Sequence, residues 1–289
     1  MAHNILGVRT LIRNWNSAIK GSSDRSNKQA DTRYSHRRLG IQNSIIFFFL
    51  AISMPVKGAE IFYELDPLPP NLSATQTQRY MASATLEGAI QPKDEEKVST
   101  FLEFLKNEKA VMINLDLKSP GGDVSTAIKI GRIIRKYEVN LRVPRDSSCV
   151  SSCVLILAGS PIRTIHGRVA IHRPYLPSLP PDATYAGVRR AFDQIAGATK
   201  SYLIEMNVNP DLWDQMVSIS PENVRYLSMG ELEHFRLIGM DPVTEEIVSH
   251  NLAKMFGISR EEFPKRQSRA NQICKSDVSC FFDVLKGLR

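Results

Sequence analysis

The residues best suited to chemistry are serines in a short polar stretch before an apolar run. This stretch reads SSCVSSCVLILAG over residues 147–159, with Ser151 and Ser152 directly before the apolar part. The preceding NLRVP (140–144) is typical of a strand, and the apolar part of a buried helix. A serine at a strand-to-helix junction can present its hydroxyl beside the next backbone N–H, as a nucleophile next to an oxyanion donor. Ser147 or Ser148 could instead simply cap the helix.

Two further motifs offer partners for such a serine. In LDLKSPGGDV (115–124), Gly121 and Gly122 permit a sharp turn whose N–H groups could hold a developing oxyanion, although Pro-Gly-Gly is also an ordinary turn. In RVAIHRPY (168–175), His172 closes a predicted strand, where it could accept a serine proton at neutral pH or serve a structural role. Together the three motifs indicate nucleophilic catalysis.

The intervening segments alternate between strand and helix patterns. Strand patterns cover 81–90, 110–117, 140–144 and 168–172, and the segment 92–108 carries the apolar spacing of a helix. A second helix follows Pro-Gly-Gly, and a long amphipathic helix is predicted over 183–206, with short helices on either side of VRYLS (224–228). This order predicts an α/β domain with a largely parallel sheet and right-handed crossovers.

The ordered motifs resemble those of the superfamily of the Clp protease proteolytic subunit and the crotonases. The resemblance is carried by INLDLKSPGGDV, CVSSCVLILAG, VAIHRPY and VRYLSMGELEHFRLIGMD, over about residues 80–241. More narrowly, the Cys-x-Ser-x-Cys stretch resembles that of exported, periplasmic Clp-like proteins of bacteria. The resemblance implies an α/β core of repeated β-β-α units with a mainly parallel sheet, here followed by a helical C-terminal tail.

The same resemblance assigns roles to the candidate residues. It implies that Ser151 is the nucleophile, with Ser152 as the second choice, and that His172 is the general base. The backbone N–H groups of Gly122 and Ser152 would form the oxyanion hole. Chemistry of this kind requires no cofactor and no metal.

The third catalytic residue is where the sequence departs from the family pattern. Val224 stands where the Clp pattern has an aspartate. We expect Asn223, or alternatively Glu222, to orient the imidazole. Signal peptide peptidase A, with a related fold, uses a lysine base, so Lys118 and Lys200 remain candidates at this stage.

The expected activity is serine hydrolysis, with a peptide or protein as substrate and a homo-oligomer as the assembly. One alternative is a catalytically inactive periplasmic protein of the same fold that acts in binding or assembly. Another is a crotonase-type acyl-CoA enzyme, which export argues against because CoA thioesters are not expected outside the cytoplasm.

The positive charge of the chain is confined to its N-terminal segment. Residues 1–58 hold nine Lys and Arg against two Asp and Glu, whereas the rest of the chain carries equal numbers of both signs. The folded part therefore has no basic bias toward nucleic acid. The apolar run SIIFFFLAISM (44–54) is typical of a signal peptide with cleavage before Ala59, or alternatively of an uncleaved inner-membrane anchor.

The expected organisation is therefore a basic N-terminal segment (1–58), a linker with a short strand (59–80), the α/β domain (81–241) and a helical tail (242–289). Export to the periplasm implies an oxidising compartment. We expect a small-loop disulfide between Cys274 and Cys280. For Cys149 and Cys153 we expect buried thiols, or a bridge outside regular helix, rather than metal binding.

Overall fold

The computed structural model describes residues 58–67, 80–175, 181–274 and 277–288. The basic segment and its apolar run 44–54 lie outside these residues. Contacts divide the chain into two compact units after Gly257. In the described part, no helix is both long and apolar enough to cross a membrane.

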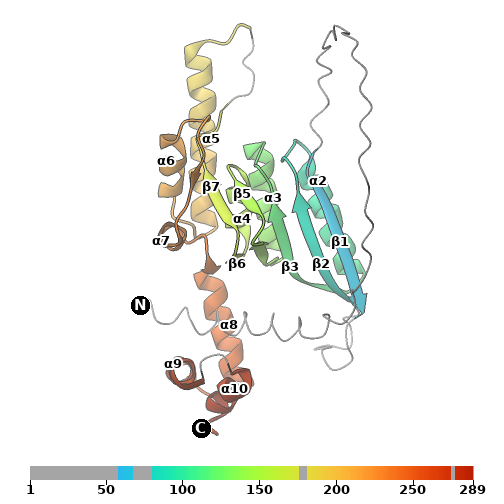
Figure 1. Cartoon of the computed structure of the whole chain (residues 1–289), viewed down its shortest axis with the longest axis vertical. Helices are drawn as coiled ribbons and strands as arrows, with labels where there is room; N and C mark the ends of the chain where they lie inside the picture. Colours follow the sequence, from blue (N-terminus) through green and yellow to red (C-terminus); the bar gives the residue numbers. More distant parts are fainter. Residues whose placement is uncertain (1–57, 68–79, 176–180, 275–276, 289) are drawn as a thin grey trace, which may run out of the picture. The chain divides into compact units, whose positions relative to one another are not determined.

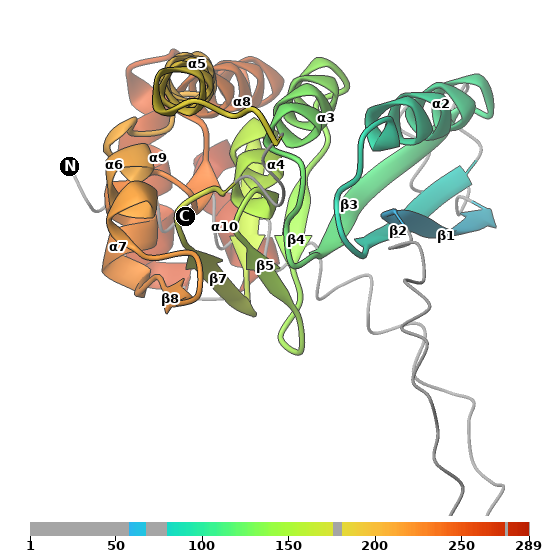
Figure 2. The ribbon, with the colours of Figure 1, turned by 90° about the horizontal axis from the view of Figure 1, so that it is seen from above.

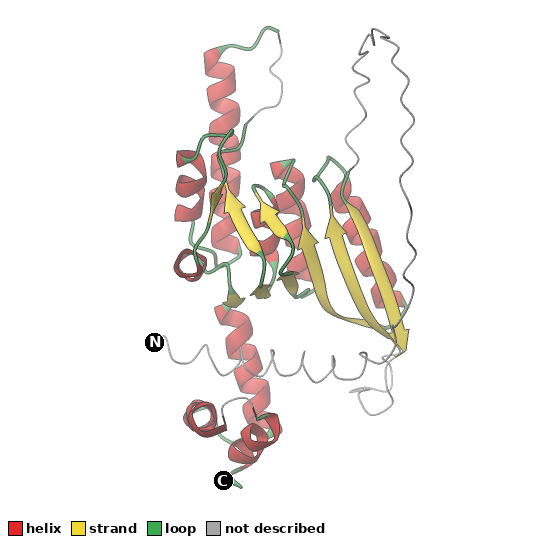
Figure 3. Ribbon diagram, in the orientation of Figure 1, coloured by secondary structure: helices red, strands yellow, loops and turns green. Residues whose placement is uncertain are grey.

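The larger unit is an α/β structure with a mixed, mainly parallel six-stranded sheet (Figures 1 and 3). Its strand order is β1-β2-β3-β4-β6-β9, in which the four central strands run parallel and both edge strands antiparallel to their neighbours. The strands are β1 (Glu60–Pro67), β2 (Tyr80–Glu87), β3 (Ala110–Lys118), β4 (Leu141–Val143), β6 (Ile162–Ile165) and β9 (Gly239–Met240). The α/β class is as the alternating pattern predicts.

A second, three-stranded sheet carries the candidate site. Strand β5 (Ser148–Val150) pairs in parallel with β7 (Arg168–Ile171), and β8 (Arg225–Tyr226) pairs antiparallel with β7. Sequence patterns predict one sheet and do not reveal this division, because short strands of either sheet have the same residue pattern.

Strand β1 lies in the segment 59–80, for which the sequence predicts a linker with a short strand, and it is an edge strand of the larger sheet. It pairs with β2 over eight residues, from Glu60 opposite Glu87 to Pro67 opposite Tyr80. Its N-terminal end is also tied to the domain, because the buried carboxylate of Asp94 accepts the Ala59 N–H at 2.9 Å. The segment 59–67 is therefore part of the sheet rather than a connection to it.

Helices connect the strands and cover the larger sheet. Figure 2 shows α2 (Asp94–Asn107) and α3 (Val124–Lys136) on one face of it. The apolar side of α2 is buried as its spacing predicts, and Asp123 caps α3 by accepting the Thr126 N–H at 2.7 Å. The remaining helices of this unit are α4 (Cys153–Gly159), α5 (Tyr185–Glu205), α6 (Asp211–Ser218), α7 (Met229–His234) and α8 (Pro242–Met255).

Helix α4 is completely buried. It contacts α3, β5 and β7. At the α3 contact, a methyl group on Gly159 would lie 2.3 Å from the Gly131 carbonyl oxygen. The buried Tyr202 hydroxyl donates to the Leu155 carbonyl at 2.8 Å.

A buried arginine holds the C-terminal end of α4. The Arg163 guanidinium donates to the carbonyls of Leu157, Ala158, Met206 and Arg236 at 2.7–3.2 Å. Burial lowers its pKa to about 10, which leaves it charged at neutral pH. This one cation thus joins the ends of α4, α5 and α7.

The second unit, from residue 258 on, is a pair of helices. It comprises α9 (Glu262–Cys274) and α10 (Val278–Lys286), which pack against each other. A disulfide joins Cys274 and Cys280, as the spacing predicts. The C-terminal tail is thus helical, and the contact division places its first helix, α8, with the larger unit.

The contact between α3 and α4 predicts a contrast between two glycine substitutions. Gly159→Ala should lower the free energy of unfolding by roughly 2–4 kcal/mol, because the methyl group meets backbone that cannot move aside. Gly197→Ala, at an α5 position with nothing within 4 Å, should raise it by about 0.5–1 kcal/mol. Urea unfolding followed by circular dichroism measures both, and equal effects would contradict this description of the contact.

Candidate functional site

The serine motif forms a tight turn between β5 and α4. Ser151 has a left-handed backbone (φ 57°), which costs a non-glycine residue about 1–2 kcal/mol. Its N–H donates to the Ala170 carbonyl at 2.9 Å, and its carbonyl accepts the Val154 N–H at 3.0 Å. The turn is therefore held on one side by β7 and on the other by the first turn of α4.

The structure distinguishes the two candidate serines. The Ser152 hydroxyl donates to the Gly122 carbonyl at 3.0 Å, and the side chain is fully buried. The Ser151 hydroxyl makes no hydrogen bond to any described residue, and Ser151 keeps 8% of its surface exposed. Ser151 is therefore the serine whose hydroxyl is available.

The Pro-Gly-Gly turn lies directly against the serine turn. A methyl group on Gly121 would lie 2.7 Å from the Ser151 Cβ and 3.0 Å from the Ser152 nitrogen. Both Gly121 (φ 95°) and Gly122 (φ 147°) have backbone conformations that favour glycine. The approach to the serine turn is thus possible only because Gly121 has no side chain, whereas a methyl group on Gly122 would lie 2.1 Å from the Ile90 carbonyl oxygen.

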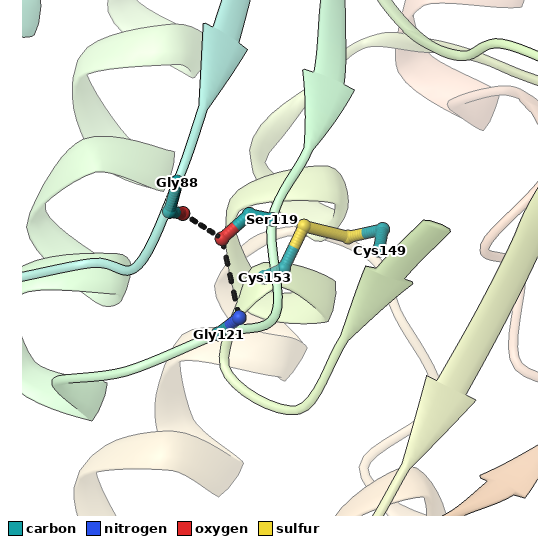
Figure 4. The surroundings of a disulfide bond; sticks show 5 residues. All are labelled: Gly88, Ser119, Gly121, Cys149 and Cys153. Carbon is teal, nitrogen blue, oxygen red and sulfur yellow. Dashed lines mark hydrogen bonds between the residues drawn. A yellow bond between two sulfur atoms is a disulfide. The ribbon is translucent and has the colours of Figure 1, made fainter. Parts of the chain in front are cut away.

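Hydrogen bonds around Ser119 fix the two turns relative to each other. Its N–H donates to the Ser148 carbonyl, and its carbonyl accepts the Val150 N–H, which joins the end of β3 to β5. Its hydroxyl donates to the Gly88 carbonyl at 2.7 Å and accepts the Gly121 N–H at 3.1 Å (Figure 4). This arrangement leaves the N–H groups of Gly122 and Ser152 without an acceptor in the described chain.

His172 follows the end of β7, beside the serine turn. Ala170, which accepts the Ser151 N–H, lies two residues before it on the same strand. The imidazole is mostly buried and has no hydrogen bond to Ser151 in this structure. Its Nδ1 lies 3.0 Å from the Arg173 carbonyl oxygen. Because a carbonyl only accepts, this contact places the proton on Nδ1 and leaves Nε2 with a lone pair.

Among the described residues, neither Asn223 nor Glu222 forms a hydrogen bond with the imidazole. The Asn223 amide donates to the Ser220 hydroxyl at 2.9 Å. Hydrogen bonds from its own backbone N–H and from Ser220 lower the pKa of Glu222. The orienting group in the structure is the Arg173 backbone carbonyl, which sequence patterns cannot reveal because any residue type supplies one.

The two candidate lysines are paired elsewhere. Lys118 forms an ion pair with Glu87 at 2.7 Å, and Lys200 forms one with Asp214 at 2.8 Å. The structure therefore gives no contact between either lysine and the serine turn. A histidine-based site fits the arrangement better than a lysine-based one.

Cys149 and Cys153 form a disulfide on either side of the serine turn. Their Cα atoms are 5.3 Å apart, and both side chains are fully buried. Cys149 lies on β5 and Cys153 is the first residue of α4, so the bridge lies outside regular helix, one of the two states expected from the sequence. The structure thus has two disulfides, which are typical of proteins in oxidising compartments.

Comparisons with known proteins add a distant structural likeness. No protein-family model matches the sequence, and no curated protein matches it. Among solved structures, the chain is similar to a mutant of the 1510-N membrane-bound stomatin-specific protease, at 15% sequence identity and a TM-score of 0.41. The match covers 58% of this chain and 82% of that chain.

Proposed function

We propose that this chain is an exported serine hydrolase that cleaves peptides. Ser151 is the nucleophile, His172 the general base, and the N–H groups of Gly122 and Ser152 the oxyanion hole. The observation that carries the proposal is the available Ser151 hydroxyl in a strained turn, next to two N–H groups without acceptors. The motif resemblance to the Clp peptidases and the two disulfides support the substrate class and export, respectively.

The proposed reaction begins with attack of Ser151 Oγ on the carbonyl carbon of the scissile bond. The hydroxyl proton passes to His172 Nε2, and the carbonyl oxygen becomes an oxyanion that accepts from the two N–H groups. His172 then gives this proton to the leaving amine. A water molecule hydrolyses the acyl-enzyme by the same steps, which restores Ser151.

This site is a serine–histidine dyad with a backbone carbonyl as its orienting group. The Nδ1–H contact with Arg173 selects the tautomer that can accept the serine proton. A neutral carbonyl stabilises the imidazolium less than a carboxylate does, so the dyad depends more heavily on its oxyanion donors. In the proposed mechanism, Ser151 and His172 form their hydrogen bond when the substrate binds, because catalytic hydrogen bonds tighten in the substrate complex.

A fluorophosphonate probe tests the nucleophile. The native protein should be labelled, and Ser151→Ala should abolish labelling, because the probe reacts only with an activated hydroxyl. Ser152→Ala is the matched control and should retain labelling within about tenfold, since its proposed contribution is a backbone N–H. Mass spectrometry identifies the modified residue, and circular dichroism verifies folding.

Absence of labelling in the folded native protein would refute the proposal and favour a non-catalytic protein that acts in binding or assembly. Labelling of Ser151→Ala at the native rate would refute the assignment of the nucleophile. Cleavage of an unfolded protein such as casein, lost in Ser151→Ala, tests the substrate class separately.

The dyad geometry gives a second prediction, for the residues around His172. Asn223→Ala should change the rate of casein cleavage by less than about threefold, because the Asn223 amide contacts Ser220 and not the imidazole. His172→Gln should lower it by roughly 10²- to 10⁴-fold through loss of the general base. If both variants lose activity equally, Asn223 is the orienting residue and the dyad assignment is wrong.

A further inference from the structure

We infer that the Cys149–Cys153 disulfide is a positioning device that holds Ser151 in its reactive conformation. This inference rests on the proposed function for its catalytic consequence, and on the structure alone for its mechanical part. The disulfide joins Cys149, the middle residue of β5, to Cys153, the first residue of α4, and so encloses Ser151.

The turn lacks the side-chain cap that helices of globular proteins commonly use. Ser152, at the N-cap position of α4, makes no capping hydrogen bond, and its hydroxyl donates to the Gly122 carbonyl. The caps of α3, α5, α7, α8 and α10 accept backbone N–H groups with a side chain, whereas those of α2 and α6, like that of α4, make no such hydrogen bond. At α4 the disulfide provides a covalent restraint at the end where this hydrogen bond is missing.

The turn also needs a restraint, because its central residue is in an unfavourable conformation. The left-handed backbone of Ser151 persists only where its surroundings enforce it. Two hydrogen bonds hold the residue, one to Ala170 and one from Val154. The disulfide spans both and fixes the separation of Cys149, on the β7 side, from Cys153, on the α4 side.

Burial shows that the bridge acts permanently rather than as a switch. Both cysteines have no exposed surface, and Cys149 is also fixed in the sheet by its parallel pairing with Val169 and its bridge to Ser119. A reductant in solution has no access to the folded bridge. The second disulfide, Cys274–Cys280, lies in the other unit and does not enclose the site.

The test compares two double variants of the full chain. Cys149→Ala with Cys153→Ala should lower the rate of Ser151 labelling and the kcat for casein cleavage by roughly 10- to 100-fold, with KM nearly unchanged, because a small displacement of the nucleophile affects the chemical step. Cys274→Ala with Cys280→Ala is the matched control and should leave both rates unchanged.

Hydrogen exchange measured by mass spectrometry gives a readout that does not require activity. Amides of the peptide spanning 148–155 should exchange faster in the Cys149/Cys153 variant, whereas amides of β2 and β3 should keep their native rates. Unchanged exchange over 148–155 would overturn the inference whatever the activity. Faster exchange with native labelling would overturn the positioning role.

The outcomes separate this inference from the proposed function. One outcome is that the native protein is not labelled by the probe, while the Cys149/Cys153 variant exchanges faster over 148–155. This outcome would refute the proposed hydrolase activity and would support the disulfide as a restraint on the turn. If the Cys149/Cys153 variant fails to fold, the Cys274/Cys280 variant is instead refolded with dithiothreitol. That sample keeps both cysteine side chains of the turn and loses only the bond between them, and native exchange and labelling in it would refute the inference.

Discussion

The close approach of two backbone turns is the constraint on which the rest of this structure depends. Gly121 meets the serine turn at a distance that no side chain permits, and Ser119 locks the contact with hydrogen bonds to both neighbouring chain segments. The approach determines where α3 and α4 begin and which N–H groups remain unpaired. The glycines are therefore required by contact as well as by backbone conformation.

The helix that follows the serine turn, α4, is itself held in the core. A fully buried helix without polar side chains on its inner faces is positioned by close contacts, and here these are the glycine contact with α3 and the Tyr202 hydroxyl. Arg163 holds the same C-terminal end of α4, by donating to the carbonyls of Leu157 and Ala158. The N-terminal end of α4 is restrained by the disulfide at Cys153, so both ends of the helix that follows the serine turn are held.

The sequence predicted the parts of this structure that depend on residue pattern. The α/β class follows from alternating apolar segments, and the neighbourhood of the serine, glycine and histidine motifs follows from their order in a known motif pattern. The division into two sheets and the pairing of β1 were not predicted, because strand partners are chosen by tertiary contacts that apolar spacing does not encode. The hydrogen bond from His172 to a backbone carbonyl was also not predicted, because every residue type supplies such a group, and the catalytic role of Asn223 stays a prediction.

The sequence also could not decide whether Cys149 and Cys153 form a disulfide. Two cysteines four residues apart can be bridged only where the chain leaves regular helix, and the left-handed conformation of Ser151 is what provides that departure. Spacing alone therefore left thiols and a bridge equally open. The backbone conformation of Ser151 thus allows Cys149 and Cys153, two positions away on either side, to form a disulfide.

The proposed site depends mainly on the direction of its backbone N–H groups. Because no described carboxylate forms a hydrogen bond with the imidazole, the main electrostatic stabilisation in the proposed dyad comes from the N–H groups of Gly122 and Ser152. Backbone donors are effective only when their direction is fixed before the reaction, because reorientation during the reaction would cost the energy they supply. The disulfide around Ser151 and the close contact at Gly121 both restrict the direction of these N–H groups.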